Sequence, residues 1–248
     1  MKKQDFTFIL IALILVLPFI PLPFFKSFQD AFLYNKNGDM WYASSFLKFA
    51  ILATMGEAIG LRISAGVYNR KGFGLIPRAI VWGFLGIGIK MAMVVFSAGT
   101  PVLVEKFFCI TDAIKSMDKK VCPDYLAAAN AGLGFTRIIT AFFISTFMNL
   151  TFAPVFMTYH KITDTHILEN GGTLSGFFRW IKLKEIFPRL NWSVQWNFVF
   201  KKTIPFFWIP AHTITFLLPG EYQVIFAAAL GIVLGVFMSI ANLKTATK

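Results

Sequence analysis

The sequence predicts an all-α fold, a polytopic transmembrane helix bundle of about six spans. Of the 248 residues, 56% are hydrophobic and only 15% are charged, and 30 are phenylalanine. A soluble domain of this length does not need so many apolar side chains. Long apolar stretches separated by polar segments recur along the whole chain, so we expect a single integral membrane domain over residues 1–248.

The first apolar stretch, Phe6–Phe25, is expected to be a retained anchor span. A short basic segment precedes it, its length suits a full span, and no small-residue cleavage site follows it. Pro18, Pro21 and Pro23 crowd its far end, where the backbone bonds that they remove can be replaced at the membrane interface. Residues 1–25 therefore form an anchor added to the rest of the bundle.

The second stretch, Ala43–Tyr68, carries a carboxylate near its middle, Glu57. A charge inside a membrane span is costly, and it marks either a functional path or a paired structural site. Gly56 and Gly60 flank Glu57 in a G-x-x-x-G spacing, which lets a neighbouring helix approach closely. The carboxylate and a helix-packing seam are thus predicted on one segment.

The third stretch, Ala79–Ala98, has Lys90 near its centre and a glycine-rich packing face at Gly83–Gly88. Glu57 and Lys90 each lie about 15 to 20 Å along their segments at 1.5 Å per residue, near mid-bilayer from opposite ends. The spacing therefore allows Glu57 and Lys90 to form an ion pair.

A loop of mixed charge, Gly99–Asp124, holds both cysteines, Cys109 and Cys122. They lack the spacing of metal ligands. Because the loop is expected on the outer side, an oxidising compartment would allow a disulfide between them.

The following apolar stretch, Tyr125–Tyr159, is too long for one span, so we expect a short helix or re-entrant piece and then a fourth span from about Phe135. In that span Arg137 lies near the end, where its side chain can snorkel. Over 172–190, apolar residues then recur at helical spacing on one face, and basic residues lie on the opposite face. This pattern predicts an amphipathic helix on the membrane surface that favours anionic lipid.

Two more spans complete the bundle. Thr203–Leu218 is short and contains prolines, and it is expected to extend backwards toward Trp192. Tyr222–Asn242 carries a second G-x-x-x-G, Gly231 and Gly235.

The cationic residues set the orientation. With the N-terminus inside, about fifteen Lys and Arg residues fall on inner segments and about six in outer loops, as the positive-inside rule requires. Six spans therefore place both termini on the cytoplasmic side. The net charge of +12 is explained by this asymmetry, so no nucleic-acid partner is expected.

The polar residues inside the spans are the candidate functional set: Glu57, Lys90, Asn149 and His212. They could line a water-filled passage for small solutes, and the excess of cations favours anionic ones. Alternatively, Glu57 and Lys90 fix helix register and the other groups are interhelical hydrogen-bond partners. The spacing leaves both interpretations open. The sequence has no nucleophile–base pair, phosphate loop or metal-spaced cluster, so neither an enzyme nor a cofactor or metal is expected.

Three stretches resemble, in order, signatures of the family of the Mpv-seventeen mitochondrial inner membrane protein and the twenty-two-kilodalton peroxisomal membrane protein: MGEAIGLRI, FMNLTFAPVFMTY and WIPAHTITFLLPGEYQVIFAAALGIVLGVFMSIAN. The resemblance covers about 43–242. Leu61 and Met148 stand where the family has a Gln and an Asp. The residues that match in identity or character are Gly56, Glu57, Asn149, Ala153, Pro154, Phe216, Pro219 and Tyr222.

This resemblance implies a compact helical bundle in an internal membrane that acts as a non-selective or metabolite-permeable channel. From the sequence itself we expect the lipid bilayer as a partner, with anionic lipid at the basic cytoplasmic face, and a homo-oligomer of the chain is a candidate. We expect the bacterial cytoplasmic membrane, with the mitochondrial inner or peroxisomal membrane as the alternative.

Overall fold

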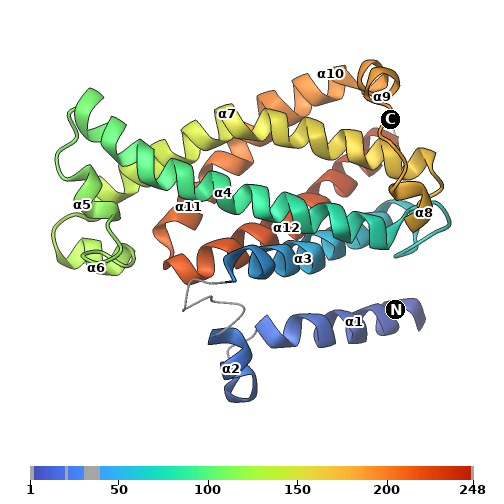
Figure 1. Ribbon diagram of the computed structural model, residues 1–248, viewed down its shortest axis with the longest axis horizontal. Coiled ribbons are helices and arrows are strands. Elements are labelled where there is room, and N and C mark those ends of the chain that lie inside the picture. The colour runs from blue at the N-terminus through green and yellow to red at the C-terminus, as the bar shows by residue number, and fades with distance from the viewer. Residues whose placement is uncertain (1–2, 20–21, 31–39, 247–248) are drawn as a thin grey trace. The chain divides into compact units, whose positions relative to one another are not determined.

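The computed structural model describes residues 3–19, 22–30 and 40–246 (Figure 1). These residues form helices and no strand, which confirms the predicted all-α class. The chain divides into two compact units. The first comprises 1–87, 162–186 and 228–248, and the second comprises 88–161 and 187–227.

The N-terminal helix is shorter than expected. α1 (Lys3–Val16) is followed by the single turns η1 (Leu17–Phe19) and η2 (Pro23–Phe25) and by α2 (Lys26–Phe28). Pro18 in η1 and Pro23 at the start of η2 contribute to this break, since each one removes a backbone donor. Residues 1, 2, 20 and 21 of the expected anchor lie outside the described part.

The next helices are longer than the predicted spans. α3 (Trp41–Ala65) matches the Glu57 segment, whereas α4 (Leu75–Phe107) begins before and ends after the expected third span. The start of the expected outer loop is therefore helical. That loop also contains α5 (Ala113–Met117).

The predicted division of the long apolar stretch is confirmed. A short helix, α6 (Tyr125–Asn130), precedes α7 (Gly134–Glu169), which continues well past Tyr159.

The expected amphipathic helix at 172–190 is wrong. The segment contains two short helices, α8 (Leu174–Phe177) and α9 (Leu183–Arg189). α8 stops after one turn because the chain tightens there, with the Arg179 N–H donating to the Gly176 carbonyl at 3.2 Å. The residues between the two helices present Trp180 at 95% exposure.

Helix also continues without interruption through α10 (Trp192–Val194), the π-helical segment η4 (Gln195–Trp208) and α11 (Ile209–Leu217). This agrees with the expected backward extension of the fifth segment. The last helix is α12 (Gly220–Ala246).

Two helices of the described chain, α4 and α7, are long and apolar enough to cross a membrane, so the six-span arrangement is not supported. Among the other apolar segments, Gln4–Phe19 and the described part of α12, Tyr222–Val233, are shorter. Only 33% and 39% of the most apolar windows of α4 and α7 are buried. Large side chains on these helices are exposed, including Phe84 at 65% and Val155 at 70%.

In the first unit α3 packs closely on α4 through glycines of the predicted packing face. A Cβ at Gly86 would lie 2.5 Å from Cβ of Phe49, and one at Gly83 would overlap the ring of Phe46. At Gly88, by contrast, nothing lies within 4 Å of an added Cβ. The packing face is therefore formed by the first two of these glycines.

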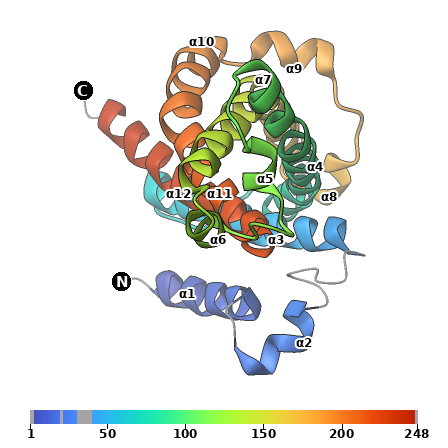
Figure 2. The ribbon, with the colours of Figure 1, turned by 90° about the vertical axis from the view of Figure 1, so that its left-hand side faces the viewer.

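In the second unit α5 and α6 lie beside the start of α7 (Figures 1 and 2). Arg137 connects them: its Nη1 donates to the carbonyls of Ser116 and Cys122, each at 2.7 Å. The side chain is 2% exposed, so the predicted snorkelling is wrong, and Arg137 instead satisfies carbonyls of the loop.

Candidate functional site

A charged cluster in the first unit is centred on Arg78, in the first turn of α4. Nη1 of Arg78 donates to Oε2 of Glu57 and to Oδ1 of Asp164, each at 2.5 Å. The Arg78 side chain is 6% exposed, and the two carboxylate side chains are 17% and 16% exposed. One buried guanidinium thus joins carboxylates from α3 and from the last part of α7.

The second oxygen of Glu57 is also engaged. Nε1 of Trp82 donates to Oε1 of Glu57 at 2.7 Å. Because Arg78 and Trp82 are four residues apart on α4, they lie on one face of that helix, toward α3. Two donors from one helix therefore fix the orientation of the Glu57 carboxylate.

The loop before α4 supports the guanidinium from its other side. Nε of Arg78 donates to the Phe73 carbonyl at 2.8 Å, and the Phe73 ring lies 4.4 Å from the guanidinium carbon. Gly74 has φ +73°, and a Cβ there would lie 2.9 Å from Cα of Gly172. Glycine is required at this point because the loops before α4 and after α7 touch through their backbones.

The predicted helix-packing seam lies beside Glu57. A Cβ at Gly56 would lie 2.8 Å from the carbonyl oxygen of Gly231, and one at Gly235 would lie 2.7 Å from the carbonyl oxygen of Gly56. The two G-x-x-x-G motifs of α3 and α12 thus face each other, as such motifs allow. Gly60, the fourth residue of the predicted set, is buried.

The expected ion pair of Glu57 with Lys90 is replaced by pairing with Arg78. Because α4 begins at Leu75, Arg78 lies inside the helix and next to the turn that joins α3 to α4. Lys90 is about three turns further along the same helix, about 18 Å at 1.5 Å per residue. Within the described residues, no hydrogen-bonded or ion-paired partner of Lys90 is present.

The other two candidates, Asn149 and His212, meet in the second unit. Nδ1 of His212 lies 3.0 Å from Nδ2 of Asn149 and 3.2 Å from its Oδ1, so the assignment of the amide group and the imidazole tautomer together decide which atom donates. Oγ of Ser145 donates to the Ile209 carbonyl at 2.7 Å. Asn149 and His212 are 1% and 8% exposed, so these groups join α7 to α11 and do not face an open passage.

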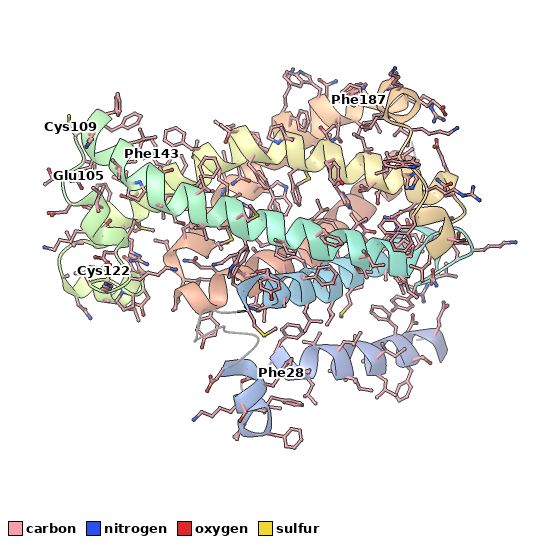
Figure 3. The ribbon with its side chains drawn as sticks, in the orientation of Figure 1. Phe28, Glu105, Cys109, Cys122, Phe143 and Phe187 are labelled. Atoms are coloured by element: carbon pink, nitrogen blue, oxygen red, sulfur yellow. The ribbon has the colours of Figure 1, made fainter. Side chains whose placement is uncertain are left out.

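Cys109 and Cys122 are free thiols, and the expected disulfide is not formed. Figure 3 places Cys109 beside the end of α4 and Cys122 beside α6. Cys109 is exposed, whereas Cys122 is fully buried with Ala128 and Leu133. Packing of Cys122 and the hydrogen bonds of Arg137 hold the loop in place of a disulfide.

A cavity of about 840 Å³ is present in the first unit, but its lining is almost entirely apolar and does not include Glu57. In the cluster itself, Arg78 binds one oxygen of each carboxylate. The geometry therefore favours an ion-pair network that joins three helices.

Searches against protein-family models, curated proteins and solved structures find no match to this chain.

Reasoning from the sequence found Glu57 and missed its partners. Arg78 precedes the predicted third span, Ala79–Ala98, and nothing in the apolar pattern marks Trp82 or Asp164 as partners of Glu57. The start of α4 was the missing information. A helix beginning at Leu75 would have placed Arg78 and Trp82 on one face, opposite the segment that carries Glu57.

Proposed function

We propose that this chain is an integral membrane protein whose charged cluster fixes the packing of α3, α4 and the end of α7. The proposal is carried by the buried Arg78 guanidinium, which is shared by Glu57 and Asp164. A buried cation with two carboxylates sets helix register, because any other packing would leave a charge without its partner.

The membrane assignment rests on the exposed apolar faces of α4 and α7. A core helix of a soluble protein is mostly buried, whereas about two thirds of the most apolar window of each helix is not. Lipid would cover such faces, and the exposed aromatic and basic residues near Trp180 suit an interface with anionic lipid. We propose the bacterial cytoplasmic membrane, with both termini inside, and the organellar membranes as the alternative.

A small-solute channel is the second candidate. It is favoured by the partial exposure of the Glu57 and Asp164 side chains, which leaves part of each side chain accessible to solvent. The resemblance to the Mpv-seventeen family points in the same direction.

Reconstitution into liposomes separates the two functions. The structural role predicts that flux of small anions stays at the level of protein-free vesicles. Flux that is lost in a stably folded Glu57→Gln variant would refute it and support the channel. Retention of the native protein in carbonate-washed membranes tests the membrane assignment independently.

A further inference from the structure

A long apolar groove separates α1 from α3 in the first unit. Its volume is about 840 Å³, within the range of small-molecule sites. The walls come from α1 at Ile11 and Ala12, from α3 at Ala50 and Thr54, and from the start of α4 at Ile76. Figure 1 shows α1 running alongside α3 in the opposite direction.

α1 is held at its first turns by a polar clasp. Nε of Arg62 donates to Oδ1 of Asp5 at 2.7 Å, and Nε2 of Gln4 donates to the Gly66 carbonyl at 2.8 Å. The ring of Phe8 stacks on that of Tyr68 with centroids 3.8 Å apart. Gln4, Phe8 and Tyr68 of this clasp also line the cavity, so the clasp forms one end of the groove.

We propose that this groove binds one acyl chain of an anionic phospholipid, with the headgroup at the clasp end. The inference rests on the proposed membrane location. The groove has an apolar body, and polar lining at Gln4 and Asn69 lies at its clasp end. Exposed Arg70 and Lys71 follow Asn69 directly. Apolar walls with two cations at one end complement a lipid tail with an anionic headgroup.

The outer surface of α1 supports the same occupant. Phe6, Leu10 and Leu13 are 68%, 51% and 57% exposed, so α1 is apolar away from the groove as well as toward it. Lipid can cover both faces of such a helix. A polar solute would match neither the groove walls nor this surface.

Photolabelling tests the proposal on the full chain in nanodiscs of phosphatidylcholine. The probe is phosphatidylglycerol with a diazirine near the end of one acyl chain, and labelled positions are mapped by mass spectrometry. We expect stronger labelling at Ala12, Ala50 and Thr54 in the groove than at residues on the outer face of α1. Ala12→Trp fills the groove and should lose most of this labelling. Leu13→Trp, on the exposed face, should retain it, and thermal melts show whether both variants are folded.

A second comparison tests the headgroup. Arg70→Gln and Lys71→Gln should each lower groove labelling by phosphatidylglycerol about fivefold, the factor expected for one cation at an anionic surface. A second probe, phosphatidylcholine with the same diazirine-bearing acyl chain, should label the groove equally in these variants and in the native protein.

Three results would overturn the inference: groove labelling no higher than at Leu13, unchanged labelling in Ala12→Trp, or cross-linking of the groove to a second copy in place of lipid. Protein that stays in carbonate-washed membranes with an unlabelled groove refutes this inference alone. Protein that is washed out refutes the membrane assignment.

Discussion

Replacing Arg78 by methionine is the most direct test of the charged cluster. The substitution keeps much of the side-chain volume and leaves Glu57 and Asp164 without their shared cation. Each carboxylate oxygen lies 2.5 Å from the same Nη1, so the two oxygens are at most about 5 Å apart. At an effective dielectric constant of about 20, two unit charges at that separation repel by about 3 kcal/mol. We expect the free energy of unfolding to fall by about 3–5 kcal/mol, the usual cost of removing one partner from a buried ion pair.

The measurement is reversible unfolding in detergent, followed by circular dichroism, for a set of matched variants. Lys90→Gln removes a half-buried cation from the same helix, and it should cost less than about 1 kcal/mol, as substitutions outside such networks do. A triple variant, Arg78→Met with Glu57→Gln and Asp164→Asn, removes all three charges and should recover most of the lost stability.

Two results would contradict this reasoning. If Arg78→Met costs no more than Lys90→Gln, the cluster does not hold the helices. If the triple variant is as unstable as Arg78→Met alone, the loss arises from packing and not from unpaired charge.

Three further predictions follow from other contacts. Gly56→Ala should cost about 1–3 kcal/mol in the same unfolding assay because its Cβ meets the backbone of α12, whereas Gly88→Ala, with nothing within 4 Å, should be neutral or stabilising; equal effects would contradict the seam. Arg137→Met should cost about 2–5 kcal/mol by leaving two loop carbonyls unbonded, and an unchanged melting curve would show that the loop does not depend on it. Maleimide should modify Cys109 in the folded protein and Cys122 only after unfolding; equal rates would rule out the burial of Cys122.

The helical class and most of the helix positions follow from local sequence properties. The segment of Glu57, the division between α6 and α7, and the two G-x-x-x-G packing motifs were predicted, because apolar run length and small-residue spacing are read directly from the chain. That the two motifs face each other is seen only in the structure. Helix ends were predicted less well. α4 begins at Leu75, and the expected helix at 172–190 is broken, since helix ends depend on capping and turn contacts that apolar patterns do not encode.

The partner of Glu57 shows where sequence reasoning stops. The sequence by itself determined that a carboxylate lies in an apolar helix, where an unpaired charge is costly, and it offered Lys90 as one possible partner. Lys90 was the predicted partner because it and Glu57 lie at similar distances from the starts of their apolar stretches. That comparison assumes that both helices begin at the membrane surface. Only the tertiary structure shows that Arg78 is the cation that binds Glu57, and that Asp164, distant in sequence, binds the same guanidinium. Which side chains meet depends on helix register and on the backbone contact between the loops before α4 and after α7, at Gly74 and Gly172. Both are set by packing between segments distant in sequence.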